Sequence, residues 1–192
     1  MHPDFAAFDY IIQPGWNNSL PEHWQSHWQQ LLGARRVANR EWHAPQLEDW
    51  LQGLDAAVRD ASKPVIVIAH SLGCATVAHY AARHGRQLAG ALLVAPADVE
   101  RASAPAQLQP FAPLPQGALP FPALVVASDS DPFSLPLRSV RMATHWHSRL
   151  YWLRDAGHIN VASGHQRWEQ GLAYLRELID DIRAATPQPA SA

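Results

Sequence analysis

Short apolar runs alternate along the chain with longer amphipathic stretches. The clearest run covers residues 64–69 (PVIVIA), and a continuous, largely β-branched segment of this kind is typical of a strand buried on both faces. Other apolar runs predict further strands at 9–13, 35–38, 89–94, 123–128 and 148–153.

Helical periodicity fills most of the intervals between these strands. In residues 47–60, Leu47, Leu51, Leu54 and Val58 share one face, as the buried side of an amphipathic helix does. Further helices are predicted at 21–32, 73–84 and 166–183. Strands that alternate with helices predict an α/β fold in which a mostly parallel sheet carries helices on both faces.

One interval departs from this alternation. Residues 95–122 hold seven prolines, which predicts a long surface excursion rather than another strand and helix, and long loops are often functional. No repeat or linker divides the sequence, so residues 1–192 are expected to form one domain. The tail from Ala184 is small, polar and rich in proline, and we expect residues 184–192 to be disordered.

Composition narrows the class of protein. Hydrophobic residues make up 47% of the chain and charged residues 17%, which is a globular composition. A net charge of −2 without a basic run argues against nucleic acid or an anionic membrane as partner. No apolar segment reaches the roughly 20 residues of a membrane-spanning helix. The single cysteine, Cys74, and the lack of a signal-peptide pattern favour the cytoplasm.

Ser71 stands in the segment AHSLG, directly after the clearest strand and directly before a predicted helix. This is the context of a nucleophile elbow, in which small residues flank a serine because the strand and helix backbones pass close together. The usual pattern is G-x-S-x-G, and Ala69 replaces the first glycine. A serine that only caps the helix is the alternative. That role explains Ser71 but not the small residues on both sides.

Two later segments supply partners for a nucleophilic serine, which needs a base to be activated. Asp131 and His158 each follow a predicted strand, and the order serine, acid, histidine is that of enzymes with a nucleophile elbow. The carboxyl ends of parallel strands meet at one edge of the sheet, so the three side chains are expected to meet. Asp129 and Asp98 compete with Asp131, which the following proline favours because it fixes the turn.

An acyl-transfer site also needs hydrogen-bond donors for the developing oxyanion. The backbone N–H after the nucleophile belongs to Leu72, and the loop after the first strand offers Trp16, since Pro14 has no N–H. His70 is expected to shape the elbow, because adjacent residues on a sharp turn point apart. Residues expected to line the substrate site are Gly15, Asn17, His70, Phe133 and Ile159.

The chain resembles a known family over about residues 10–182. The segments IIQPGWNNSLPEHWQSHW, APQLEDWLQGL, VIVIAHSLGCATVAHYA, LPFPALVVASDSDPF and AGHIN together resemble the YdeN-type small serine hydrolases, a family that includes the retinoblastoma-binding serine hydrolase. The resemblance implies a compact α/β-hydrolase fold of six strands in the order 2-1-3-4-5-6, without a large cap. It implies a triad of Ser71, Asp131 and His158, and places residues 95–122 where larger relatives carry a lid.

These observations together predict a serine hydrolase that cleaves a carboxylic ester, or an amide or thioester, through an acyl-enzyme. No cofactor is expected, and the partner is a small-molecule substrate. No metal is expected either: His23 and His27 have the spacing of two helical metal ligands, but no glutamate follows His23. The alternative is a protein-interaction module that keeps the hydrolase fold with little turnover, since fold does not fix function.

Overall fold

The computed structural model of the protein describes residues 3–84 and 88–185. Its centre is one sheet of six parallel strands in the order β2-β1-β3-β4-β5-β6. The strands are β1 (Asp9–Gln13), β2 (Arg35–Arg36), β3 (Val65–His70), β4 (Gly90–Val94), β5 (Ala123–Ser128) and β6 (Arg149–Leu153). The predicted strand order and parallel α/β fold are therefore confirmed.

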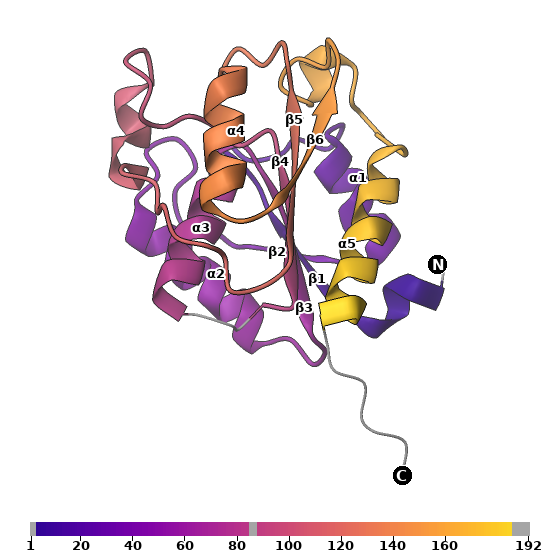
Figure 1. Ribbon diagram of the computed structural model, residues 1–192. Helices are drawn as coiled ribbons and strands as arrows, with labels where there is room; N and C mark the ends of the chain where they lie inside the picture. The colour runs from indigo at the N-terminus through magenta and orange to yellow at the C-terminus, as the bar shows by residue number, and fades with distance from the viewer. Residues whose placement is uncertain (1–2, 85–87, 186–192) are drawn as a thin grey trace.

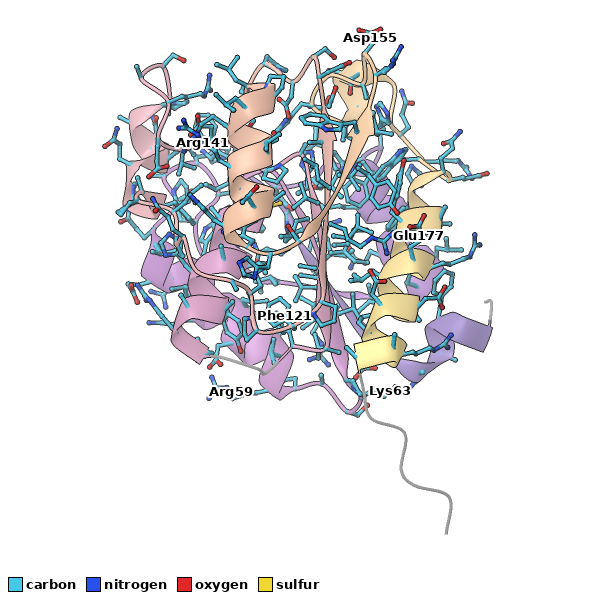
Figure 2. The ribbon with its side chains drawn as sticks, in the orientation of Figure 1. Arg59, Lys63, Phe121, Arg141, Asp155 and Glu177 are labelled. Atoms are coloured by element: carbon cyan, nitrogen blue, oxygen red, sulfur yellow. The ribbon has the colours of Figure 1, made fainter. Side chains whose placement is uncertain are left out.

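Helices cover both faces of the sheet (Figure 1). On one face lie α2 (Leu47–Arg59), α3 (Leu72–His84) and α4 (Pro136–His145), and on the other α1 (Trp24–Leu32) and α5 (Gly171–Ala185). Side chains fill the space on each side of the sheet (Figure 2). Within the described part of the chain, no separate cap stands over the sheet.

The two faces have separate apolar cores. One core holds Trp50 and Leu54 of α2 with Tyr80 of α3. The other holds Trp24 of α1, which lies in edge contact with the Trp168 ring at 5.1 Å between centroids. All residues of β3, β4 and β5 are buried, as expected for strands covered on both faces.

Residues 95–122 add no further strand or α-helix between β4 and β5, as their prolines predicted, but the segment is anchored in the core at several points. They include the 3-10 helix η2 (Ala106–Phe111), and Val99, Leu108 and Phe111 are buried in the core beside α3. The carbonyl of Phe111 also makes a 2.9 Å hydrogen bond with Nε2 of His79 on α3. The prolines prevent a regular strand or α-helix here, but they do not prevent apolar side chains of the segment from packing in the core. These buried side chains hold the segment against α3.

Two helix starts lie three or more residues from the prediction. α1 begins at Trp24 rather than at 21, because the Nδ1 atom of His23 accepts the N–H of Gln25 and caps the helix there. α5 begins at Gly171 rather than at 166. Trp168 lies before the helix with a φ of 44°, and a Cβ at Gly171 would stand 2.4 Å from its indole ring.

Helix α4 was not predicted. Its buried positions are Ser139, Met142 and Ala143, whereas Leu137 and Val140 are exposed. Apolar side chains on the solvent face therefore blur the amphipathic pattern on which the prediction depended.

The predicted single domain over residues 1–192 stays a prediction. The expected disordered tail began too early, because Ala184 and Ala185 form the last residues of α5, and residues 186–192 lie outside the described residues. No helix in the described part of the chain combines the length and apolar character needed to cross a bilayer.

Candidate active site

Ser71 occupies a strained turn between β3 and α3. Its φ is 55°, a left-handed conformation that costs a non-glycine residue roughly 1–3 kcal/mol. The turn is held because its N–H donates to the carbonyl of Val94 at 3.0 Å and its carbonyl accepts the N–H of Cys74 at 3.0 Å. These bonds place the side chain at the carboxyl end of the central strand.

The small residues around Ser71 allow three backbones to approach one another. A Cβ at Gly73 would stand 2.4 Å from the carbonyl oxygen of Gln13, so α3 passes directly over the end of β1. A Cβ at Gly15 would stand 2.8 Å from Cβ of Ser71. Ala69 is fully buried inside β3, where its methyl group is accommodated.

His158 and Asp131 complete a hydrogen-bonded chain that begins at Ser71. Nε2 of His158 lies 2.9 Å from Oγ of Ser71, and its Nδ1 lies 3.0 Å and 2.9 Å from the two carboxylate oxygens of Asp131. Both side chains are buried. Oδ1 of Asp131 also accepts the N–H of Phe133 at 2.8 Å, which fixes the carboxylate on its loop.

The loops that carry Asp131 and His158 are fastened to each other. Oγ of Ser128 accepts the N–H of Ala156 at 3.1 Å, and Oγ of Ser130 accepts the N–H of Gly157 at 3.0 Å. Oδ1 of Asp129 accepts the N–H of Asp155 at 2.8 Å. The loops after β5 and β6 thus form one unit.

Of the three candidate carboxylates, only Asp131 lies against the His158 ring in the described part of the chain. Asp129 serves the loop contact above. Asp98 forms a 3.0 Å ion pair with Arg138 of α4 and accepts the N–H of Glu100 at 3.1 Å. Both are therefore occupied elsewhere.

His70 connects the elbow to the histidine loop. Its Nε2–H donates to the carbonyl oxygen of His158 at 2.9 Å, and the two rings lie 4.8 Å apart. Burial lowers the pKa of His70 well below its usual 6.5, and the nearby His158 and His23 add to the effect. His70 is therefore a neutral donor.

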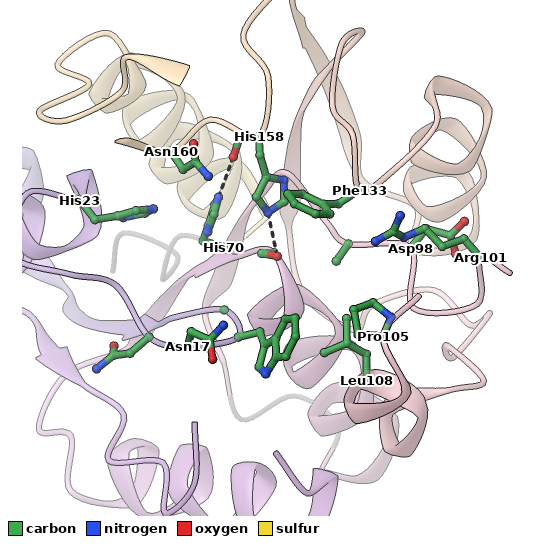
Figure 3. A pocket seen from close by; sticks show the side chains of 15 residues that line it. Asn17, His23, His70, Asp98, Arg101, Pro105, Leu108, Phe133, His158 and Asn160 are labelled. Carbon is green, nitrogen blue, oxygen red and sulfur yellow. Dashed lines mark hydrogen bonds between the residues drawn. The ribbon is translucent and has the colours of Figure 1, made fainter. Parts of the chain in front are cut away.

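A cavity of about 310 Å³ opens over Ser71 (Figure 3). It is lined by residues from the loop after β1, the elbow, the segment after β4 and the loops after β5 and β6: Gly15, Trp16, Asn17, Asn18, His23, His70, Ser71, Ala97, Asp98, Arg101, Pro105, Leu108, Phe133, His158 and Asn160. The hydroxyl of Ser71 thus faces space that a small molecule can fill.

The backbone N–H groups of Leu72 and Trp16 lie beside this cavity and have no hydrogen-bond partner among the described residues. The indole of Trp16 is held separately, because its Nε1–H donates to the carbonyl of His43 at 2.9 Å. The N–H of Asn17, next along the chain, donates to the carbonyl of Trp42. The loop after β1 is therefore fixed while the Trp16 N–H stays unengaged.

Comparison with known proteins identifies the family. The model of the serine hydrolase family matches residues 10–177. The chain belongs to this family. Within it, the chain is similar to a YdeN-like hydrolase from Pectobacterium atrosepticum, with 32% identity over 93% of this chain and 94% of that one, at a TM-score of 0.82.

Other solved structures share the fold of this serine hydrolase. The ydeN gene product of B. subtilis is 22% identical over 90% of this chain and 98% of that one, with a TM-score of 0.71. The monoacylglycerol lipase of Paleococcus ferrophilus is 11% identical over 91% and 94%, with a TM-score of 0.68. A search of curated protein sequences gave no match. The resemblance to YdeN-type small serine hydrolases is confirmed.

Ile159 is the one expected lining residue that this serine hydrolase holds elsewhere. Its side chain is fully buried in the core beneath α1 and α5, and its carbonyl accepts the indole N–H of Trp24 at 2.8 Å. Its φ of 48° turns the chain so that His158 faces the cavity while Ile159 faces the core. Gly15, Asn17, His70 and Phe133 line the cavity as expected.

Sequence reasoning missed several lining residues. Asn18 and Asn160 each stand next to a recognised segment, and their polar amides beside loop glycines are a signal that could have found them. Arg101 and Leu108 come from the proline-rich segment, whose course over the site has no local sequence signature. His23 had been weighed only as a metal ligand.

Proposed function

We propose that this serine hydrolase cleaves a carboxylic ester by a Ser-His-Asp mechanism through an acyl-enzyme, with Ser71, His158 and Asp131 as the triad. One observation carries the proposal: Nε2 of His158 lies 2.9 Å from Oγ of Ser71 while Asp131 holds the opposite ring nitrogen. In this geometry Nε2 of His158 can take the proton of Ser71, which leaves Oγ as a nucleophile facing the cavity.

In the first half-reaction, Oγ of Ser71 attacks the carbonyl carbon of the ester as its proton passes to Nε2 of His158. The carboxylate of Asp131 keeps the Nδ1–H tautomer and stabilises the imidazolium that forms. The carbonyl oxygen becomes an oxyanion, for which the N–H groups of Leu72 and Trp16 are the proposed donors. His158 then gives its proton to the departing alcohol, and the C–O bond breaks.

In the second half-reaction, His158 takes a proton from water, and the hydroxide attacks the acyl carbon. The imidazolium returns the proton to Oγ of Ser71 as the carboxylic acid leaves. No step needs a metal or an organic cofactor. Esters are favoured over amides because an alcohol leaves with less assistance than an amine.

A fluorophosphonate probe tests the proposal, because it reacts with activated serines. Wild type should be labelled, whereas Ser71→Ala and His158→Ala should not. Ser62→Ala is the matched control, since Ser62 lies before β3 at the opposite end of that strand and bonds to Asp9. An unlabelled wild type would contradict the proposal and favour the protein-interaction alternative. The cytoplasmic location expected from the sequence stays a prediction.

A further inference from the structure

The cavity over Ser71 has two chemically different walls (Figure 3). Phe133, Pro105 and Leu108 lie on one side of the serine and are apolar. His23 and Asn160 lie on the other side. Asn18 of the loop after β1 also lines the cavity, and the next residue, Ser19, is hydrogen-bonded to Gln25 and Ser26 of α1, the helix that His23 caps. We call Asn18, His23 and Asn160 the polar wall.

Each side chain of the polar wall has its acceptor atom occupied by a backbone N–H. Oδ1 of Asn18 accepts from Ser19 at 2.7 Å, and Oδ1 of Asn160 accepts from Ser163 at 3.2 Å. Nδ1 of His23 accepts from Gln25 at 3.1 Å. A backbone N–H can only donate, so these contacts fix the orientation of both amides and the tautomer of the imidazole.

The atoms left over are all donors. They are the Nδ2 groups of Asn18 and Asn160 and the Nε2–H of His23, and none has a partner among the described residues. Burial lowers the pKa of His23 to about 3, with Arg36 as a further cause, so the ring is a neutral donor at ordinary pH. A wall that only donates matches a group that only accepts.

A positive charge stands behind this wall. The guanidinium of Arg36 donates to Oδ1 of Asn18 at 2.9 Å, to the carbonyl of Ser19 at 2.8 Å and to Oγ of Ser26 at 2.7 Å. Its partners are all uncharged, and no carboxylate pairs with it in the described part of the chain. Its charge therefore reaches the polar wall without local compensation.

The cavity offers no opposing negative charge on this side. Asp98 is the acidic residue among those that line it, and it lies with Arg101 on the apolar side, paired to Arg138 (Figure 3). An ammonium group would meet only donors and a cation at the polar wall. A carboxylate would meet three donors and one favourable charge.

We propose that the polar wall binds a carboxylate, so that the substrate is an ester with a second, ionised carboxyl group. The inference rests on the proposed ester hydrolysis at Ser71 and adds the chemical class of the substrate. The three uncharged donors of the polar wall, with the single positive charge of Arg36 behind them, match a group with one negative charge. Pro105, Leu108 and Phe133 on the opposite side are left for the hydrocarbon part of the substrate.

Two matched pairs of esters test the proposal. In the acyl pair, the 4-nitrophenyl ester of adipic acid is compared with that of monomethyl adipate. In the leaving-group pair, the acetyl ester of 3-hydroxybenzoate is compared with that of 3-hydroxybenzamide. Only the pair whose carboxylate lies on the side of the ester that meets the polar wall should respond. In that pair the carboxylate ester should have a kcat/KM about tenfold higher than its uncharged partner, as expected for charge-assisted hydrogen bonds.

Isosteric variants test whether the polar wall causes the preference for a carboxylate. Asn18→Asp and Asn160→Asp keep the capped Oδ1 atom but exchange the unpaired Nδ2 donor for a charged oxygen, so each should abolish the preference. Gln30→Glu adds the same charge on an exposed position of α1 and should preserve it. Arg101→Gln removes the cation that lines the opposite side of the cavity and should also preserve the preference.

The outcomes separate this inference from the proposed function. Fluorophosphonate labelling with no carboxylate preference in either pair overturns the inference and leaves the hydrolase mechanism intact. A preference lost in Arg101→Gln but kept in Asn18→Asp also overturns it. If labelling itself fails, calorimetry decides without turnover: tighter binding of 3-hydroxybenzoate than of 3-hydroxybenzamide, lost in Asn18→Asp, supports the polar wall, and equal binding overturns it.

Discussion

The imidazole of His70 donates its Nε2–H to the backbone carbonyl of His158 at 2.9 Å. The bond joins the end of the central strand to the loop that holds the proposed base, across 88 positions of the chain. Both residues are buried, and a carbonyl can only accept, so His70 must be the donor. His70, the residue before Ser71, thus helps to position His158 relative to Ser71.

Substitution of His70 by phenylalanine is expected to lower kcat while the protein stays folded. Phenylalanine preserves the ring but leaves the buried carbonyl of His158 without a donor, at a cost of about 1–3 kcal/mol. His70→Gln keeps a side-chain N–H and should retain more of the activity than His70→Phe. Steady-state kinetics and thermal unfolding of both variants measure this. Equal kcat values for the two would show that ring packing, not the donor, is what matters.

Asp131→Asn is expected to remove most of the activity with little change in stability. The asparagine Oδ1 can still accept the N–H of Phe133, but its amide N–H would donate to Nδ1 of His158. The imidazole would then carry its proton on Nε2, facing Ser71, where it cannot accept another. In serine proteases the equivalent change costs about 10⁴ in kcat, and a loss of at least 10² is expected here.

Ester hydrolysis measured beside urea unfolding checks that expectation, with Asp129→Asn as the control. Asp129 accepts a loop N–H, which an asparagine can also accept, and it does not touch the imidazole. Comparable losses of kcat in the two variants would argue against Asp131 as the partner of His158.

The strands of the sheet could be predicted well because each is encoded by a short apolar run of the sequence. A run such as PVIVIA predicts a strand buried on both faces, and strands that alternate with helices limit the sheet to a few parallel topologies. The strand order itself came from the family resemblance. The triad geometry followed too, since strand ends meet at one edge of the sheet. The predicted roles of Ser71, Asp131 and His158 stay predictions until the variants are measured.

What the sequence could not predict depends on contacts between distant segments. Ile159 was expected in the cavity because it follows His158, but its positive φ and the indole of Trp24 turn it into the core. The polar wall depends on which atom of Asn18 or Asn160 a backbone N–H occupies, and no residue pattern encodes that choice. The lining from residues 95–122 required the docking of that segment on α3.

Gly73→Ala is expected to destabilise the protein strongly. The added Cβ would stand 2.4 Å from the carbonyl oxygen of Gln13 and 2.7 Å from that of Pro14, and neither backbone atom can move aside without shifting β1. Overpacking of this kind costs about 1–3 kcal/mol or more. Gly117→Ala is the control, because a Cβ there meets nothing within 4 Å. Urea unfolding should separate the two, and equal stabilities would contradict the close approach of α3 to β1.

Acid is expected to destabilise the folded protein through His23. Burial lowers its pKa from the usual 6.5 to about 3, so between these values the unfolded chain binds a proton that the folded chain excludes. The folded state therefore has its full stability from this group above pH 6.5 and loses it as the pH falls. At pH 5 the loss from one such histidine is about 2 kcal/mol.

His23→Asn isolates this contribution, because asparagine is a good N-cap that can still accept the N–H of Gln25 but does not titrate. The free energy of unfolding, measured in urea at pH 7 and pH 5, should fall by about 2 kcal/mol less in His23→Asn than in wild type. In the control His145→Asn, at an exposed position of α4, the free energy of unfolding should fall as much as in wild type. Identical losses in all three proteins would mean that His23 is protonated in the folded state, and the polar wall would then carry a charge of its own.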